Sequence, residues 1–472
     1  HAHMVTSDND MFQCLGHCKI VDPKTLKVFT QKHFEEKYKV HPSQWPICKS
    51  IGGCFDRKTE ILTNRGWIFI KDISLNDLVY SIDPETQQAT YTKIVDIIKY
   101  KYKGEMYSIK GRLIDLLITP DHEFFGCSTQ SYSPQRNKPQ FQTIENIIKK
   151  YKNFTIPLTS NWNGGNNEKY FTLPKYISKF NMPNGGVRIT KKEELKIKME
   201  DWLSFFGIWL ADGYTSKNRN KKIGVVGISK IKKHKRRRIK KQIDKLPFVW
   251  NIEKNGFSTN SVQLANYLNK IGNTYTKFIP QDIKDLSPEL LKIIIKWMVH
   301  GDGCKSKSKC SYNNIKYSTM SYFTCNKKLA DDFQEIAIKC GYCNSISTRP
   351  PRKWNIKGKT GRSKEQYRIK FNKSRTLNLR KKEITKIESD DFVFDITTEP
   401  NHTIFVRRNG NAVWSSNCSG DNVIGVKGAS DPKNPSSQAI KYVCGKLSKG
   451  KLLTRIKSKE GQEIIQRNSQ LV

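Results

Sequence analysis

No apolar run in this chain reaches the ~20 residues that a membrane-spanning helix requires, and no secretory signal opens the sequence. We therefore expect no membrane partner and a cytoplasmic location. Cysteine is sparse, since 12 residues spread over 472 lack the density of a disulfide-stabilised secreted scaffold. Acidic residues are also few, because 43 Asp and Glu face 84 Lys and Arg and leave a formal net charge of +41. A charge of this size favours a phosphate backbone as the partner.

The sequence pattern changes twice along the chain. Short apolar runs broken by turn residues predict strands from residue 54 to about residue 175. A helical apolar period begins near Trp202, and strand patterns return after about residue 380. The order β, then α/β, then β indicates one domain inserted into another. We place the segments at 1–53, 54–175, 176–380, 381–417 and 418–472.

One pair of cysteines, Cys340 and Cys343, has a spacing that suits zinc. However, Phe333, Ile336 and Cys340 follow a helical period, and Gly341 comes next. We therefore expect Cys340 to be the last core residue of a helix that Gly341 ends, rather than a metal ligand.

The residues around Cys54 could break a peptide bond of the chain's own backbone. The Cys54 thiol can attack the carbonyl carbon of Gly53 and convert the amide into a thioester, which is an N-to-S acyl shift. Gly53 has no side chain to obstruct the tetrahedral intermediate. The shift also needs a polarised amide and a proton relay, and Thr119 and His122 in the segment TPDH are the candidates.

A second set of residues lies at the far end of the same segment. Cys418 provides a thiol that could take over the acyl group from Cys54, and Asp395 could steer or deprotonate that thiol. Asn417 could then cyclise its side-chain amide onto its own carbonyl and cut the second junction. His402 is the expected proton donor or acceptor for that cyclisation.

These residues lie in blocks that resemble those of an intein, a protein-splicing element. The blocks are CFDRKTEILTNRGW, RLIDLLITPDHEFF and VFDITTEPNHTIF, and the resemblance covers residues 54–417. It implies a mostly β, horseshoe-shaped (Hint-type) splicing domain that excises itself without a cofactor and ligates Gly53 to Cys418. Inteins usually carry His before the terminal Asn, whereas this chain has Ser416. A DNA endonuclease with impaired splicing, in which His402 carries more of the proton transfer, is therefore an alternative.

Two acids stand at the ends of apolar segments in the inserted region. Asp212 ends FFGIWLADG, and Asp302 ends KWMVHGDG. Two carboxylates that meet at paired helix ends can hold Mg²⁺, which activates a water and stabilises the charge on a scissile phosphate. Ala211 and Gly301 precede the acids, and small residues at these positions permit a close approach of the two helices.

Both acidic segments resemble the signature helices of LAGLIDADG homing endonucleases, which often lie inside inteins. The resemblance implies an α/β domain with a duplicated, pseudo-symmetric αββαββα plan. Such a domain cleaves double-stranded DNA as a monomer with one acid for each strand, and the expected target is the host gene without the insertion. Lys277 in KFIP matches the family's Lys-x-x-Pro block, whose lysine assists the chemistry. Trp297 stands where the first segment has Gly207, so a DNA-binding module without catalysis is a further alternative.

The two flanks, once joined, resemble part of a 5′ nuclease of the flap-endonuclease and polymerase-exonuclease type. The matching segments are VTSDNDMFQCL and SGDNVIGVKGA, with Asp8, Asp10 and Asp421 as the implied metal ligands. Residues 425–428 match a helix–hairpin–helix, which binds backbone phosphate through main-chain amides. The resemblance implies small α-rich flanks. We expect them to be inactive alone, because the other acids of such a nuclease have no counterpart in this sequence.

Overall fold

The computed structural model describes residues 3–6, 9–23, 25–38, 42, 53–128, 139–181, 186–217, 223–229, 233–309, 316–356, 358–372, 374–398 and 400–417. Cys418, Asp8, Asp421 and the expected hairpin at 425–428 lie outside these residues. Asp10 lies in the 3-10 helix η1 (Asn9–Gly16), but its side chain is outside the description. No helix in the described ranges has both the length and the apolarity to cross a membrane.

The N-terminal flank differs from the α-rich fold that the sequence predicts. Its described part is a three-stranded sheet with one α-helix and η1, and its elements are β1 (His3–Val5), β2 (Lys19–Val21), β3 (Val28–Phe29) and α1 (Gln31–Tyr38). The Asp22 N–H donates to the Lys27 carbonyl at 3.0 Å, which closes a turn between β2 and β3. Strands form here because short apolar runs that contain β-branched residues lie on either side of this turn.

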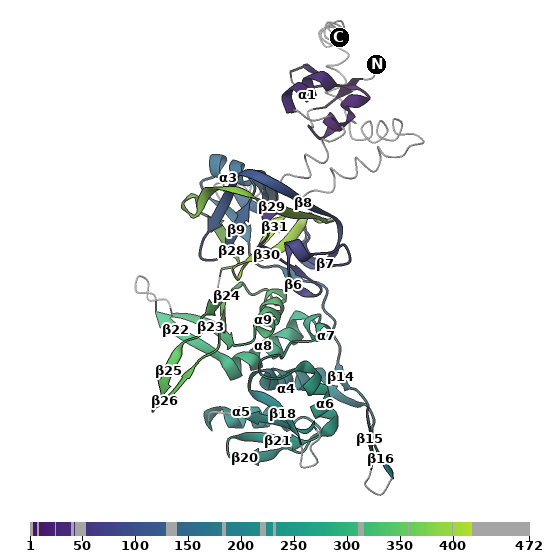
Figure 1. The fold of residues 1–472 in the computed structure, drawn as a ribbon, viewed down its shortest axis with the longest axis vertical. Coiled ribbons are helices and arrows are strands. Elements are labelled where there is room, and N and C mark those ends of the chain that lie inside the picture. Colours follow the sequence, from purple (N-terminus) through teal and green to yellow (C-terminus); the bar gives the residue numbers. More distant parts are fainter. Residues whose placement is uncertain are drawn as a thin grey trace.

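Strands from before and after the insertion form one β unit (Figure 1). The strands before it are β4 (Phe55–Asp56), β5 (Glu60–Thr63), β6 (Gly66–Phe69), β7 (Leu78–Ile82), β8 (Gln88–Lys110), β9 (Asp115–Ile118), β10 (Glu123–Ser128), β11 (Gln140–Thr143), β12 (Phe154–Pro157) and β13 (Asn161–Trp162); η3 (Ile70–Asp72) and α3 (Ile144–Lys150) lie among them. The strands after it are β28 (Thr376–Leu379), β29 (Ile384–Thr398), β30 (Thr403–Arg408) and β31 (Asn411–Ser416), with η4 (Lys381–Glu383) between β28 and β29. The long β8 pairs with β29, and β30 pairs with β5 and β31. This part of the chain is mostly β, as its short apolar runs predict.

The inserted region contains two halves with a similar order of elements. The first half is α4 (Met199–Asp212), β18 (Gly213–Lys217), β19 (Ile223–Ser229), α5 (Lys233–Ile243), β20 (Asn251–Glu253), β21 (Gly256–Asn260) and α6 (Val262–Ile271). After α7 (Gln281–Lys284), the second half is α8 (Pro288–Asp302), β22 (Gly303–Lys309), β23 (Lys316–Thr324), α9 (Lys327–Lys339), β24 (Asn344–Arg349), β25 (Lys353–Ile356), β26 (Lys359–Arg362) and β27 (Gln366–Phe371). The sheet orders are β18-β19-β21-β20 and β22-β23-β27-β24, so β25 and β26 form an added hairpin. The first half ends with α6. The second half has no helix at the corresponding place and continues into β28, which pairs with β12 of the β unit.

Helix α4 is apolar on nearly all its faces. These faces are buried, since neighbouring elements enclose the helix. Trp202 is fully buried and stacks on Phe171 with ring centroids 3.8 Å apart. Phe171 belongs to β14 (Tyr170–Leu173), which pairs with β17 (Leu195–Lys198). The residues of β14, assigned above to the segment 54–175, therefore pack on the core of the insertion. In the sequence between β14 and β17, β15 (Tyr176–Asn181) and β16 (Val187–Lys192) form a separate two-stranded ribbon (Figure 1).

The β unit and the insertion share one sheet through β24 and β31. Ser345 pairs with Asn411, and the Ile346 N–H donates to the Gly410 carbonyl at 3.0 Å. The Gln334 side chain on α9 donates to the same carbonyl at 3.2 Å. The second half of the insertion therefore supports the hairpin of β30 and β31, whose last strand leads into Asn417.

Candidate active sites

The Gly53–Cys54 peptide is buried and held on both sides. The Cys54 N–H donates to Thr119 Oγ1 at 2.8 Å, and the Gly53 carbonyl oxygen lies 2.5 Å from His122 Nδ1. Gly53 has φ +106°, a conformation that L side chains rarely adopt, so glycine fits this bend without strain. The structure thus brings the predicted residues Cys54, Thr119 and His122 together around one amide.

A tight turn after β9 presents Thr119 and His122 to that amide. The Thr119 N–H donates to the Cys54 carbonyl at 3.0 Å, which extends the pairing of β9 with β4. The His122 N–H donates to the Thr119 carbonyl at 3.1 Å and closes the turn. Both side chains therefore face the start of β4.

His122 is neutral and has a defined tautomer. Burial lowers the pKa of His122 to about 4, although its hydrogen bond with Gly53 opposes this shift. A neutral imidazole has one donor and one acceptor nitrogen, and the Gly53 carbonyl can only accept. Nδ1 therefore donates to Gly53, and Nε2 accepts from the Ser415 hydroxyl at 2.7 Å. The rings of Phe55 and Phe124 pack against the imidazole, with centroids 4.5 Å and 5.3 Å away.

Asn417, at the second junction, is held by main-chain and side-chain bonds. Its N–H donates to the His402 carbonyl at 3.2 Å, and its Nδ2 donates to Thr398 Oγ1 at 2.7 Å. Its buried Oδ1 has no hydrogen-bond partner among the described residues. The structure therefore places the predicted His402 beside Asn417 and adds Thr398 as a contact of the side-chain amide.

Asp395 lies opposite Cys54 at the end of the pairing between β29 and β4. β29 pairs with β4 with Phe394 opposite Phe55, so Asp395 and Cys54 are the next residues on the two strands. Asp395 is fully buried, and its Oδ1 accepts from the Ile396 N–H at 2.8 Å. Cys418, the thiol that Asp395 is predicted to steer, lies outside the described residues.

Two hydroxyls of β31 tie the second junction to the first. Ser415 donates to His122 Nε2, and Ser416 donates to the Glu123 carbonyl. Ser415 and Thr398 are not among the residues that the sequence predicts, because a small hydroxyl in an apolar strand has no characteristic spacing. The signal that could have found Ser415 is its place next to Ser416, close to the terminal Asn417.

Helices α4 and α8 cross at glycines. A β-carbon at Gly207 would lie 2.8 Å from the Ile294 carbonyl oxygen and 3.0 Å from Trp297 Cβ. A β-carbon at Gly301 would lie 2.3 Å from Ala211 Cβ. The Gly207 position therefore makes room for Trp297, so the bulky residue does not prevent the close crossing.

The crossing brings Asp212 and Asp302 into one neighbourhood. Asp212 Oδ2 lies 3.3 Å from the β-carbon position of Gly301, the residue before Asp302. Burial lowers the pKa of Lys277 to about 7, while the nearby Asp302 and Asp212 carboxylates oppose that shift. The Lys277 ammonium donates to three carbonyls at the end of α4, those of Trp209 (2.6 Å), Leu210 (3.2 Å) and Gly213 (2.8 Å).

A second lysine, missed by the sequence analysis, binds the end of α8. Lys235 on α5 donates to the carbonyls of His300 and Gly301, at 2.9 Å for the latter. Each helix that ends in one of the two acids thus has a lysine on its last carbonyls, where a cation is favourable. Lys235 therefore serves the fold, while Arg237 and Arg238 on the same helix are exposed.

The two acids fit Mg²⁺, which binds through one or two carboxylates and completes its shell with waters and substrate phosphates. The described ranges contain no cluster of three or more His, Cys, Asp or Glu that could hold a metal by themselves. Burial raises the pKa of the Cys340 and Cys343 thiols to about 12 and about 11. Gly341 follows α9 with φ +75°, which is the predicted helix end.

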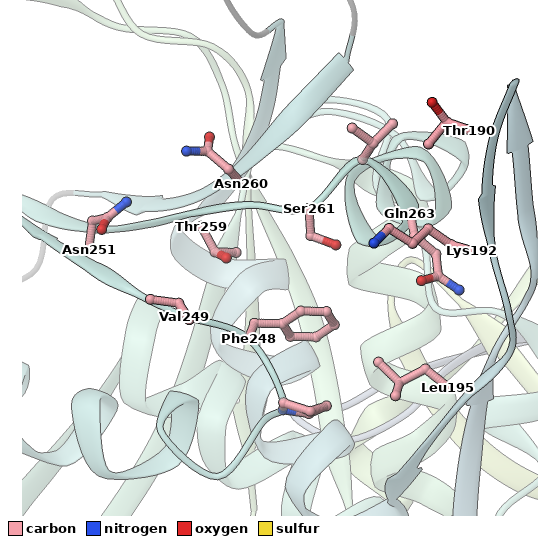
Figure 2. A pocket seen from close by; sticks show the side chains of 12 residues that line it. Thr190, Lys192, Leu195, Phe248, Val249, Asn251, Thr259, Asn260, Ser261 and Gln263 are labelled. Carbon is pink, nitrogen blue, oxygen red and sulfur yellow. The ribbon is translucent and has the colours of Figure 1, made fainter. Parts of the chain in front are cut away.

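A surface cavity of about 620 Å³ lies between β16 and the start of α6 (Figure 2). Its lining combines apolar side chains such as Phe248 with polar ones such as Asn260 and Gln263. None of the predicted site residues lines it. The described site residues that the sequence predicts lie away from this cavity.

No protein-family model matches the chain. Among curated proteins it is 27% identical over 303 residues to the ATP-dependent Clp protease proteolytic subunit of Chlamydomonas moewusii, which covers 62% of this chain and 28% of that protein. It is 26% identical over 409 residues to the DNA-directed RNA polymerase subunit beta C-terminal section of Stigeoclonium helveticum, and the match covers 77% of this chain and 36% of that protein. It is 23% identical over 312 residues to the ribonucleoside-diphosphate reductase subunit beta of Aquifex aeolicus, covering 63% and 41%. The chain thus spans less than half the length of each of these relatives.

Among solved structures, the chain is similar to inteins and to a homing endonuclease. A bacterial intein-like domain from Clostridium thermocellum matches with 16% identity and a TM-score of 0.17, covering 31% of this chain and 78% of that one. The homing endonuclease I-WcaI, bound to its DNA recognition sequence, matches with 15% identity and a TM-score of 0.23, covering 37% and 76%.

Proposed function

We propose that residues 54–417 are an intein that excises itself and joins the two flanks. The observation that carries this proposal is the buried Gly53–Cys54 amide held between Thr119 and His122. A structural cysteine needs neither a hydroxyl on its own N–H nor an imidazole on the preceding carbonyl. The chain near the second junction also reaches the first. Ser415, two residues before Asn417, contacts His122, which binds the Gly53 carbonyl.

In the first step, Cys54 Sγ bonds to the Gly53 carbonyl carbon and the C–N bond breaks. The thiol proton ends on the α-amine of Cys54, so the step is an isomerisation without a co-reactant. The His122 Nδ1–H points at the oxygen on which negative charge develops, and a preorganised donor there lowers the barrier. Thr119 Oγ1 holds the departing nitrogen through its N–H.

The later steps use the groups of the second junction. Cys418 Sγ bonds to the thioester carbon, the bond from that carbon to Cys54 Sγ breaks, and the proton of the Cys418 thiol passes to Cys54, with Asp395 steering the Cys418 thiol. Asn417 Nδ2 then bonds to the Asn417 carbonyl carbon, the bond to the Cys418 nitrogen breaks, and a succinimide forms, with His402 exchanging the proton. An S-to-N shift finally joins Gly53 to Cys418 by an amide. None of these steps needs a cofactor.

The curated relatives are consistent with an inserted element. Their names describe a protease subunit, an RNA polymerase subunit and a ribonucleotide reductase subunit, which are unrelated proteins. A segment similar to parts of all three is what an element carried by different hosts would give. The flanks are proposed to be the host here, a 5′-nuclease with Asp8, Asp10 and Asp421 as metal ligands that stays inactive until splicing joins it. Nuclease activity of an unspliced full-length host at the spliced rate would contradict this part.

The insertion is proposed to be a LAGLIDADG homing endonuclease that cleaves double-stranded DNA as a monomer. Its two halves share one strand order, and α4 and α8 cross closely enough to bring Asp212 and Asp302 together. These two acids would hold Mg²⁺, which when bound supplies an activated water and charge stabilisation at the phosphate. Lys277 can gain or lose a proton near both acids, because its pKa is about 7.

Intact-mass analysis of the full chain over time, under reducing conditions, tests the splicing proposal. An excised species of residues 54–417 together with ligated flanks would establish splicing. Release of residues 1–53 by added thiol without ligation would show that Cys54 reacts while the later steps stall. A single unchanged mass would contradict self-excision.

Two alternatives have their own tests. Impaired splicing is favoured by Ser416, whose hydroxyl donates to the Glu123 carbonyl rather than to Asn417. Unspliced chain that still nicks DNA would support this alternative. A non-catalytic DNA-binding module is excluded if cleavage of the uninterrupted host-gene junction requires Mg²⁺ and is lost in Asp212→Asn.

A further inference from the structure

His122 connects the two junctions through opposite edges of one ring. Its Nδ1 lies 2.5 Å from the Gly53 carbonyl oxygen, and its Nε2 lies 2.7 Å from Ser415 Oγ. His122 and Ser415 are both fully buried, so water cannot replace either bond without rearrangement. The rings of Phe55 and Phe124 also pack against the imidazole.

The two bonds of His122 depend on each other. If Nε2 carried the proton, it would face the Ser415 oxygen as a donor, and Nδ1 would present a lone pair to the Gly53 carbonyl oxygen. Two acceptors at 2.5 Å repel, and the carbonyl would lose its donor. The Gly53 carbonyl, which can only accept, therefore fixes the Nδ1–H tautomer, and the Ser415 hydroxyl satisfies the Nε2 lone pair of that tautomer by donating to it.

We propose that Ser415 is a positioning residue for the N-to-S acyl shift, acting through His122. Its hydroxyl donates to Nε2, which fixes the orientation of the imidazole and aims the Nδ1–H at the Gly53 carbonyl. This inference rests on the proposed splicing reaction and adds to it a residue that belongs to neither junction peptide.

The placement of Ser415 also orders the reaction. Ser415 lies on β31 opposite Ile404 of β30, close to the second junction, and the adjacent Ser416 binds the Glu123 carbonyl next to His122. The first junction therefore has its oriented imidazole only when β31 is in place. Since β31 leads to Asn417 and Cys418, the N-terminal amide is activated only in chains whose second junction has docked.

The test measures the first step alone, in full-length chains that carry Asn417→Ala and Cys418→Ala. Release of residues 1–53 by added thiol is followed by intact mass between pH 5 and pH 9. We expect Ser415→Ala to slow release by about 10- to 100-fold, as loss of an orienting partner does for catalytic histidines, and Ser415→Thr to restore most of the rate. Ser81→Ala is the matched control. Ser81 is equally buried on β7 and bonds Thr403 Oγ1 at 3.0 Å, so its loss removes a hydroxyl bond of the same unit.

A ¹⁵N spectrum of histidine-labelled chain gives a readout that a purely structural role would not move. We expect a protonated Nδ1 at His122 in the parent chain, and a changed Nε2 chemical shift in Ser415→Ala, where that nitrogen loses its hydrogen-bond donor. Equal release rates for Ser415→Ala and Ser81→Ala, or a protonated Nε2 in the parent, would overturn the role of Ser415 and leave splicing intact. Absence of thiol-dependent release from the parent chain would overturn both.

Discussion

Arg407 on β30 binds Asp331 on α9 across the boundary between the β unit and the insertion, with Nη1 2.7 Å from Oδ1. The same guanidinium donates to Glu60 Oε2 on β5 at 2.7 Å and to Gln334 Oε1 on α9 at 2.8 Å. It also lies 4.3 Å from the ring centroid of Trp67. Arg407 is 1% exposed, so one buried cation joins the insertion to the hairpin of β30 and β31.

We expect Arg407→Met to destabilise the whole chain rather than one part. The substitution leaves Glu60 without its partner and Asp331 with Lys327 alone, and breaking a buried pair from one side is costly. Both carboxylates keep some exposure, at 16% and 17% of their side chains, so the expected loss is about 2–4 kcal/mol. Urea unfolding followed separately at the β unit and at the insertion measures it. Lys386→Met, which removes an exposed pair with Glu105, should leave both transitions unchanged. Loss of stability in the β unit alone would contradict the shared role.

Gly207→Ala should push α4 and α8 apart. The new methyl group would meet the Ile294 carbonyl oxygen at 2.8 Å and Trp297 Cβ at 3.0 Å, and neither atom is the end of a flexible side chain. We expect a loss of about 1–3 kcal/mol in the stability of the insertion and slower DNA cleavage. Gly16→Ala, where nothing lies within 4 Å of the new atom, is the control for the substitution itself. Unchanged cleavage in Gly207→Ala would show that the crossing tolerates more separation than the acids require.

The sequence predicts the residues whose side chains would react. It does not predict the residues that only orient those side chains. Cys54, Thr119 and His122 can be predicted because their reactive groups recur in blocks of fixed order. Ser415 cannot, since its importance arises from contact with a histidine far away in the chain. The β-rich character of the first segment follows from its short apolar runs. The pairing of β8 with β29 does not, because the two strands are separated by the whole insertion and their register depends on tertiary packing.

The sequence pattern also does not predict the packing of β14 or the contacts of Arg407, because both depend on tertiary structure. Phe171 alternates with exposed residues as any half-buried strand residue does, and only the fold shows that it stacks on Trp202. The N-terminal flank was predicted to be α-rich from its resemblance, whereas the described part forms a small sheet. Local β-branched runs and a closing turn decide its structure there.

The stability of the insertion should rise with pH because of Lys277. Its pKa is about 7 in the folded chain, against an ordinary value of 10.5. Between these values the unfolded chain binds more protons, so the free energy of unfolding increases from about pH 7 towards pH 10.5. Below pH 7 both states hold the proton and this dependence ends. Urea midpoints at pH 7, 8 and 9 measure the slope, which Lys277→Met should reduce and substitution of the exposed Lys254 should not. Equal slopes in all three chains would show that Lys277 keeps an ordinary pKa.

Thr398→Val should slow cleavage at the second junction without affecting the first. Thr398 Oγ1 accepts from Asn417 Nδ2 at 2.7 Å, and that nitrogen is the proposed nucleophile. Valine has nearly the same shape but no acceptor, so the amide loses its fixed orientation while the packing is kept. A misplaced nucleophile reacts more slowly, and we expect a loss of about tenfold in the rate of succinimide formation. Cys54→Ala chains isolate this step, since they cannot form the thioester, and intact mass follows release of residues 418–472. Thr397→Val is the matched control, because Thr397 is equally buried on β29 and its Oγ1 has no hydrogen-bond partner among the described residues. Faster release in Thr398→Val would mean that the threonine restrains the amide rather than orienting it.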